Sequence, residues 1–230
     1  MIRSPFVTET QPLESQLLDA ALAHVAFDGW SSATLAAAAA ETGIEPALAR
    51  ALFPRGGVDL ALAYHARGDD AMLAELAAAD LSEIRFRDRI AFAVRARLEA
   101  IDDKEAVRRA TTLFALPQNA AAGTGAIWQT AGKIWTALGD TDTDFNWYSK
   151  RATLSGVFSA TVLFWLGDDS DGHTATWDFL DRRIDDVMQF EKAKAQIRGN
   201  KALAPLLAGP MAILSRIRAP QSRDHMPGHK

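Results

Sequence analysis

Acidic residues alternate with threonine in one short segment, a pattern that could bind a metal ion. Asp140, Asp142 and Asp144 stand at the first, third and fifth positions of an EF-hand calcium loop. Such a loop needs glycine at its sixth position and glutamate at its twelfth, and these positions hold Phe145 and Arg151. We therefore interpret the three carboxylates as helix caps and helix-dipole partners, and we expect no metal ligand.

Signatures of catalysis are also missing. The sequence has no cysteine, which excludes disulfides, thiolate metal sites and a cysteine nucleophile. No histidine follows a glutamate at the spacing of a di-iron site in a helical bundle. No glycine-rich phosphate loop and no Gly-x-Ser-x-Gly elbow occurs. The sequence thus predicts a protein without catalytic residues or cofactor, and not an enzyme.

Residues 143–151, TDFNWYSKR, place two aromatic rings side by side at a predicted helix start. Neighbouring residues on an α-helix point about 100° apart, so Trp147 and Tyr148 can hardly bury against the same surface. Spacings of three, four and seven put Asp144, one of the two rings and Arg151 on one stripe. Aromatic residues and arginine are enriched at interface hot spots, so the stripe could bind a partner. The alternative is that Trp147 packs inward and Tyr148 lies at the rim.

Apolar residues recur at spacings of three and four, and no alternating run of strand length occurs, which predicts an all-α protein. Glycine, proline and capping residues separate the elements. Helices are expected over residues 13–28, 32–42, 45–53, from 57 onward, 82–101, 104–116, 120–138, 144–166, 172–197 and 201–217.

Two stretches, 110–132 and 152–167, carry no charged residue. Neither provides the roughly 20 continuous apolar residues of a membrane-spanning helix. They either form core or line a cavity for an apolar ligand. Small residues among the large rings would leave space for that ligand: Gly123, Gly125, Ser155, Gly156 and Ser159. The candidate lipid-binding residues are Leu113, Phe114, Ile127, Trp128, Leu154, Phe158, Phe164 and Trp165.

Residues 33–62, ATLAAAAAETGIEPALARALFPRGGVDLAL, resemble the DNA-binding half of TetR-type repressors. The resemblance implies a helix-turn-helix, and glycine at the turn, here Gly43, suits that motif. Residues 31–65 carry two arginines against three carboxylates, a net charge of −1. Because Lys and Arg supply non-specific DNA affinity by neutralising phosphates, we expect a degenerate motif that binds no nucleic acid.

Three stretches are similar to the ubiquinone-biosynthesis accessory family known as the ninth Coq protein: FDGWSSATLAAAA (27–39), TDFNWYSKRATLSGVF (143–158) and TWDFLDRRIDDVMQF (176–190). The similarity extends over about residues 13–217 and identifies the chain as a bacterial member. It implies a TetR-like fold that binds isoprenoid lipids and assists the di-iron demethoxyubiquinone hydroxylase. It also implies a surface patch that docks the hydroxylase, assigned here to Ile134, Trp135, Asp144, Trp147, Tyr148 and Arg151.

The C-terminal region is basic, whereas the rest of the chain is acidic. Residues 192–230 carry a net charge of +7, and the remainder carries −11. A helix over residues 201–217 would be ~25 Å long with cations at both ends, suited to lie on an anionic membrane surface. The resemblance implies that this helix gates lipid access, whereas a dimer contact or packing on its own body is the alternative. Pro210 predicts a kink. The candidate membrane-binding residues are Lys201, Leu203, Leu206, Leu207, Met211, Leu214, Arg216, Ile217 and Arg218.

The expected organisation has five parts: a disordered N-terminus (1–12), a degenerate helix-turn-helix subdomain (13–56), a lipid-binding helical bundle (57–197), an amphipathic membrane helix (198–218) and a disordered tail (219–230). The start of the chain resembles no signal peptide, so we expect a cytoplasmic protein. The TetR-like resemblance adds the expectation of a homodimer, and the basic C-terminal helix adds that of peripheral association with the inner membrane. Its expected function is to bind a polyprenylated ubiquinone precursor and present it to the hydroxylase. The alternative is a ligand-responsive TetR-type repressor.

Overall fold

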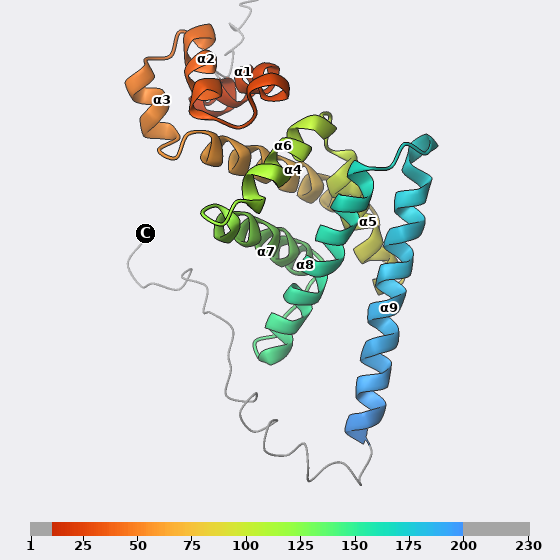
Figure 1. The fold of residues 1–230 in the computed structure, drawn as a ribbon. Helices are drawn as coiled ribbons and strands as arrows, with labels where there is room; N and C mark the ends of the chain where they lie inside the picture. The colour runs from red at the N-terminus through yellow and green to blue at the C-terminus, as the bar shows by residue number, and fades with distance from the viewer. Residues whose placement is uncertain (1–10, 200–230) are drawn as a thin grey trace, which may run out of the picture. The chain divides into compact units, whose positions relative to one another are not determined.

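The computed structural model describes residues 11–199, and all regular secondary structure within that range is helical (Figure 1). None of these described helices is long and apolar enough to cross a membrane. The all-α prediction is confirmed, whereas the predicted membrane-binding residues from Lys201 to Arg218 lie outside the described residues. The elements are α1 (Leu13–Asp28), α2 (Ser32–Thr42), α3 (Pro46–Leu52), α4 (Gly57–Ala78), α5 (Phe86–Glu99), α6 (Lys104–Ala115), α7 (Ala120–Ala137), α8 (Phe145–Leu166), the 3-10 turn η1 (Asp171–His173) and α9 (Thr174–Gly199).

The largest difference from the expected boundaries concerns the helix predicted over 82–101, which begins at Phe86 as α5. Asp80 accepts hydrogen bonds from the backbone N–H and the hydroxyl of Ser82, at 3.1 and 2.8 Å. Such local bonds between side chain and backbone compete with helix formation, so the chain turns before α5 begins. The spacing of apolar residues carries no information about this turn.

The chain divides into two compact units. The first combines the chain up to Asp70 with Ile101–Ala126, and the second combines Ala71–Ala100 with the chain from Ile127 onward. Helices α4 and α7 therefore each contribute to both units. Residue 56, the predicted end of the helix-turn-helix subdomain, lies within the first unit.

The first unit contains the predicted helix-turn-helix, formed by α2 and α3 beside α1 (Figure 1). The hydroxyl of Ser31 accepts a hydrogen bond from the backbone N–H of Thr34 at 3.1 Å and so caps α2, as its sequence predicts. Gly43 ends α2 at a φ of 68°, a left-handed conformation that glycine adopts without steric cost. Alanines on the buried face of α2, such as Ala38 and Ala39, permit close packing within the core of this unit.

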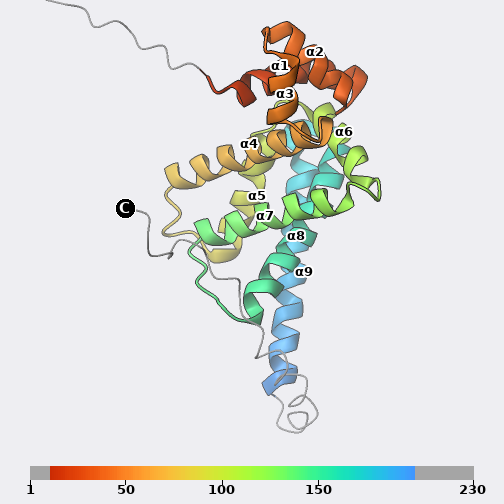
Figure 2. The same ribbon diagram turned by 90° about the vertical axis from the view of Figure 1, so that its left-hand side faces the viewer.

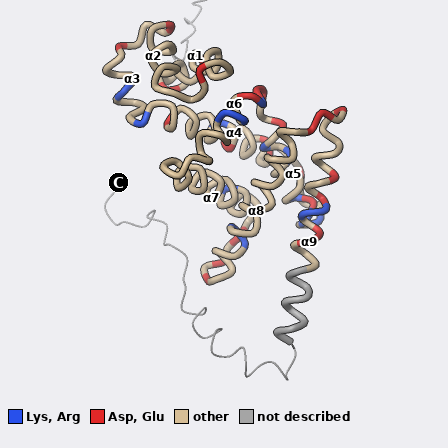
Figure 3. The backbone as a smooth tube through the Cα atoms, in the orientation of Figure 1, with Lys and Arg blue, Asp and Glu red and all other residues tan. Residues whose placement is uncertain are grey.

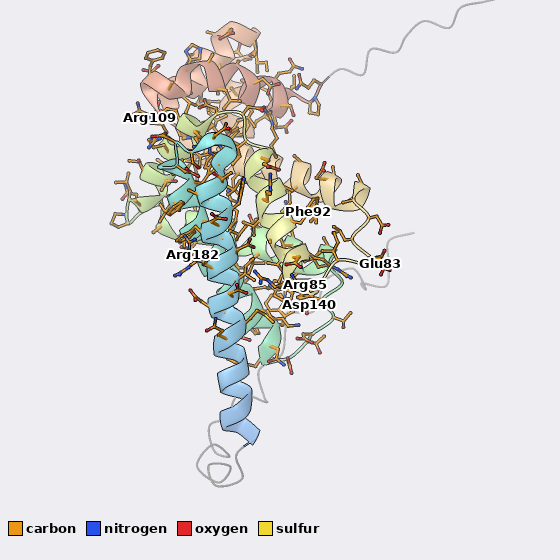
Figure 4. The ribbon with its side chains drawn as sticks, turned by 90° about the vertical axis from the view of Figure 1, so that its right-hand side faces the viewer. Glu83, Arg85, Phe92, Arg109, Asp140 and Arg182 are labelled. Carbon is orange, nitrogen blue, oxygen red and sulfur yellow. The ribbon has the colours of Figure 1, made fainter. Side chains whose placement is uncertain are left out.

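Helix α6 completes the core of the first unit. The indole N–H of Trp30 donates to the carbonyl of Ala106 at 2.9 Å, and the Trp30 ring lies 5.5 Å from the ring of Tyr64. The guanidinium of Arg109, labelled in Figure 4, donates to the carbonyl of Ala26 at 2.7 Å. The two hydrogen bonds join segments 76 and 83 residues apart in the sequence, so the helix-turn-helix is held by more than its own short helices.

The second unit is built on the antiparallel pair α8 and α9, which run side by side in Figures 1 and 2. The rings of Phe164 and Phe179 stack between them, with centroids 4.5 Å apart. Helix α5 packs on α9 through Arg87, whose guanidinium lies 2.6 Å from the carboxylate of Asp185 and 3.5 Å from that of Asp181. Along this part of α9 two arginines, Arg182 and Arg183, lie between acidic residues (Figure 3).

The connection between α8 and α9 is organised by the buried carboxylate of Asp168. It accepts hydrogen bonds from the backbone N–H of Ser170 at 2.8 Å and from the backbone N–H and hydroxyl of Thr176 at 2.9 and 2.5 Å. The bonds from Ser170 and Thr176 lower the pKa of Asp168 far below its ordinary value, against the opposing effect of burial. Asp168 therefore stays ionised and fixes the start of α9.

Two glycines of α7 provide a matched test of packing in the first unit. A Cβ atom at Gly123 would lie 2.6 Å from the Cβ of Phe114, whereas a Cβ at Gly125 would meet nothing within 4 Å. We expect Gly123→Ala to destabilise the protein by about 1–3 kcal/mol through overpacking. Gly125→Ala should stabilise it by about 0.5–1 kcal/mol, because alanine is the better helix former. Urea denaturation followed by circular dichroism measures both changes, and equal effects of the two substitutions would contradict this packing.

Acid denaturation tests the Asp168 network. A carboxylate whose pKa is depressed in the folded state contributes stability above its unfolded value of about 3.9, and loses it as the pH falls toward the folded value. Asp168→Asn should therefore lower the urea midpoint at pH 7 and equally at pH 5, and the gap from wild type should shrink at pH 3. The control is Asp169→Asn, which changes the exposed neighbour. A gap that does not change with pH would show that the charge is irrelevant.

Candidate functional site

The reversal of the chain between α7 and α8 brings the predicted partner-binding residues together. We call residues 134–151 the α7–α8 corner. Gly139 adopts a φ of 84°, which favours glycine, and the backbone N–H of Asp140 donates to the carbonyl of Trp135 at 2.9 Å. Asp144 caps α8, as predicted, by accepting from the backbone N–H of Asn146 at 2.8 Å. The end of α7 and the start of α8 are thereby fixed against each other.

A buried carboxylate lies inside this corner. The Asp140 side chain is 2% exposed, and its oxygens lie 2.7 Å from Nζ of Lys150 and 3.1 Å from a guanidinium nitrogen of Arg151. Lys150 also pairs with Asp142 at 2.6 Å. Burial alone would raise the pKa of Asp140, but hydrogen bonds and charge attraction from the two cations hold that pKa below its ordinary value. The loop and α8 are therefore joined by ionised groups.

Each cation also lies over a tryptophan ring. The guanidinium of Arg151 is 4.0 Å from the ring centre of Trp147, and it donates to the Trp147 carbonyl at 3.1 Å. Nζ of Lys150 is 5.0 Å from the ring centre of Trp135, whose indole N–H donates to the Lys150 carbonyl at 3.1 Å. Cations at such distances are attracted to the negative face of an aromatic ring. The ion pairs of Asp140 with Lys150 and Arg151 thus hold two cations against the rings of Trp135 and Trp147.

The neighbouring rings of Trp147 and Tyr148 are both half-buried, because a third ring lies against both. They meet edge to face with centroids 4.8 Å apart, and Trp128 of α7 lies 6.0 Å from Trp147 and 6.4 Å from Tyr148. Both rings thus keep some exposed surface, and their contact with a partner stays a prediction. We call Trp128, Trp147 and Tyr148 the aromatic patch.

The structure corrects the role of two residues predicted to contact a partner. Ile134 is fully buried and Arg151 is 4% exposed, so neither presents a side chain to a docking protein. Arg151 instead contacts the ring of Trp147 from within, and Ile134 belongs to the buried core. Trp135 is half-buried, with its ring 5.5 Å from that of Phe86, and Asp144 is exposed but engaged as the cap of α8.

Sequence reasoning missed three contributors to this site. Trp128 was predicted to bind lipid, yet it lies in the aromatic patch; its position seven residues before Trp135, on the same face of one helix, is the signal that could have indicated this. Asp140 was interpreted only as a cap or dipole partner, and Lys150 was given no role. Their pairing depends on the path of the loop, which no local pattern specifies.

The predicted lipid-binding residues fall into different environments. On α8, Leu154, Phe158 and Trp165 are buried, whereas Phe164 is exposed beside Leu163, which is 60% exposed. The uncharged stretch 152–167 is therefore buried on one face only. Ile127 and Trp128 are half-buried in the second unit, and Leu113 and Phe114 are half-buried in the first. Phe114 fills the space beside Gly123, whereas Gly125 and Gly156 have open space. A lipid site at these residues stays a prediction.

The α2–α3 surface corresponds to the part of a helix-turn-helix that would read DNA. Arg55 is paired with Asp59, with a nitrogen–oxygen distance of 2.6 Å, and Glu45 stands at the start of α3. Arg50 lies at an apolar groove of about 370 Å³. The groove is lined by Ser32, Leu35, Ala36, Ala39, Pro46, Ala49, Arg50, Phe53, Pro54, Arg55 and Gly56. The arrangement offers few cations for phosphates.

The comparisons with known proteins concern two different features: a family model matches the segment that contains the α7–α8 corner, and a solved structure matches the fold. A family model described as COQ9 matches residues 120–191, which include all of α7 and α8 and the whole corner. In fold, the chain is similar to a TetR transcriptional regulator from Nitrosomonas europaea, with a TM-score of 0.61 and 20% identity over 75% of this chain and 96% of that one. This likeness confirms the TetR-like fold and nothing further.

Several proteins with the name "Ubiquinone biosynthesis protein COQ9, mitochondrial" are similar in sequence to this chain. The Drosophila melanogaster protein is 31% identical over 192 residues, 81% of this chain and 59% of the fly protein. The Rattus norvegicus protein is 30% identical over 217 residues, 90% of this chain and 69% of the rat protein. The Homo sapiens protein is 29% identical over 216 residues, 90% of this chain and 68% of the human protein. This chain therefore spans only part of the length of each relative.

Proposed function

Because this chain belongs to the COQ9 family, we propose that it acts in ubiquinone biosynthesis as a non-catalytic, lipid-binding accessory protein. In this proposal it binds a polyprenylated ubiquinone precursor and presents the head group to the demethoxyubiquinone hydroxylase. The observation that carries the proposal is the aromatic patch, whose Trp147 lies under the buried Asp140–Arg151 ion pair, inside the segment that matches the family model. The helix-turn-helix lies outside that segment.

The aromatic patch has the properties of a docking site for a protein. Its three rings contact one another and are half-buried, so each keeps exposed apolar surface while its orientation is set by neighbours. Large rings that change little on binding lose little conformational entropy, and such residues dominate the energy of many interfaces. We assign the hydroxylase to this surface.

The lipid is assigned to the second unit, near the uncharged residues of α7 and α8. A prenyl tail is apolar, and its burial contributes about 25 cal/mol for each Å² removed from water. Ile127 and the exposed side of Phe164 offer apolar surface for that contact. The basic segment from residue 198 onward would bring the protein to an anionic membrane surface, where the precursor resides.

A homodimer is part of the same proposal. The exposed side of α8 carries Ala152, Gly156 and Leu163, with no charge from residue 152 to residue 167. Small residues without charge let two helices approach closely, so a second copy of this chain would cover that face.

The TetR-like fold alone favours a second candidate, a ligand-responsive repressor. Against it stand the net charge of −1 over residues 31–65 and the pairing of Arg55 with Asp59. Binding to duplex DNA that weakens steeply with salt would revive this candidate.

A substitution in the aromatic patch tests the hydroxylase assignment. Trp147→Asp introduces a charge where apolar contact is required, and we expect affinity for the hydroxylase of the same organism to fall roughly thirtyfold or more. Isothermal titration calorimetry measures the affinity, and circular dichroism checks the fold. The matched control is Phe27→Asp, which changes a ring that is 87% exposed on α1, in the other unit. Unchanged affinity of Trp147→Asp would remove the hydroxylase from this surface.

Lipid binding is tested without the hydroxylase. Mass spectrometry of organic extracts from the purified protein should detect a prenylated quinone precursor or a related isoprenoid lipid. Trp147→Asp should retain the same lipid content, because the patch is assigned to the protein partner. Extracts with no more isoprenoid than those of an unrelated protein purified identically would contradict the lipid assignment.

A further inference from the structure

The α7–α8 corner contains two cations, and each is paired with a carboxylate of the preceding loop. Lys150 lies between Asp140, at 2.7 Å, and Asp142, at 2.6 Å, and Arg151 is 4% exposed with a nitrogen 3.1 Å from Asp140. Each positive charge is thus balanced by a carboxylate of the preceding loop. An acidic surface of another protein would find no unbalanced cation among these residues.

The same contacts determine which surface remains for a partner. Arg151 covers one side of Trp147 at 4.0 Å, and the backbone of Lys150 accepts the indole N–H of Trp135 at 3.1 Å. Two of the rings are therefore held from within by groups that are themselves held by Asp140. The rings of Trp135, Trp147 and Tyr148 stay half-exposed, so each keeps apolar surface that a partner can contact.

We infer that Asp140 is a positioning residue that fixes Lys150 and Arg151 against the rings of Trp135 and Trp147, so that the aromatic patch is presented in one orientation to an apolar surface of the hydroxylase. This inference rests on the proposed function, because it names the kind of surface that the hydroxylase must offer. Asp140 does not touch the partner, since its side chain is 2% exposed. It acts through the two cations and the rings that they contact.

The salt dependence of the binding affinity distinguishes apolar docking from docking through exposed charges. Interactions between exposed charges are screened by salt, whereas apolar contact is not. Binding of the wild-type protein to the hydroxylase should therefore change by less than about threefold between 50 and 500 mM NaCl. A steep loss of wild-type affinity with salt would show that exposed charges drive binding, and would overturn the inference.

Substitution of the carboxylate tests the positioning role. Asp140→Asn keeps the shape of the side chain but removes the charge that balances the two cations. We expect roughly tenfold weaker binding, together with a salt dependence that the wild type lacks. The matched control is Asp142→Asn, which removes a more exposed carboxylate that pairs with Lys150 alone, and it should change affinity less than threefold. Equal effects of the two substitutions would overturn the assignment to Asp140.

A double-mutant cycle separates positioning from a general loss of stability. If Asp140 acts through Arg151, then Asp140→Asn should weaken binding little further in an Arg151→Met background, which keeps an apolar stem over Trp147. Additive losses of affinity would show that Asp140 does not act through Arg151.

A readout inside the molecule keeps this inference distinct from the proposed function. In ¹⁵N-labelled protein, Asp140→Asn should shift the indole N–H resonance of Trp135, which donates to Lys150, and leave that of Trp30 unchanged in the other unit. If the wild type fails to bind the hydroxylase but these shifts occur, the hydroxylase is the wrong partner and Asp140 still holds the corner. Unchanged Trp135 resonances in Asp140→Asn would overturn the positioning role whatever the partner.

Discussion

The buried carboxylate of Asp140 joins the loop after α7 to the start of α8, and the geometry of the corner depends on it. Removal of a carboxylate from water is costly, and two cations within 3.1 Å offset that cost. Ion pairs of this kind often add little net stability, but loss of one member leaves the other buried and unbalanced. Their effect here is geometric: Lys150 and Arg151 can each meet Asp140 only when α8 has one orientation relative to the loop.

The helix boundaries were predictable because local chemistry specifies them. Ser31 caps α2, Gly43 ends it in a left-handed conformation, and Asp144 caps α8, each through atoms within three residues of the boundary. The start of α5 was missed because Asp80 and Ser82 form a turn where the apolar spacing is helical. Patterns of three and four residues thus locate helices but do not register competing turn bonds.

The site was predictable in part, and the limit has a physical cause. Helical spacing places Asp144, Trp147 and Arg151 on one stripe, but spacing cannot say which edge of a stripe faces solvent. Arg151 proved buried because its partner is Asp140, eleven residues earlier and across a turn. Trp128 likewise joined the aromatic patch through contacts across two helices. Contacts of this range follow from the path of the chain, so single-sequence patterns leave them open.

The helix-turn-helix is stabilised by core contacts that do not depend on the charges exposed on α2 and α3. Its stability comes from alanine packing on α2 and from Trp30, which donates to Ala106 of α6, and none of these groups is needed for phosphate contact. Charges on the exposed faces of α2 and α3 are free to change, since surface substitutions away from such contacts cost little. The corner obeys the opposite rule. Its half-buried rings contact two cations that pair with the buried Asp140, so a change at Asp140 would alter a surface that Asp140 itself does not reach. The orientation of the corner's rings therefore depends on groups beneath the surface, whereas α2 and α3 are held by contacts in the core of their own unit.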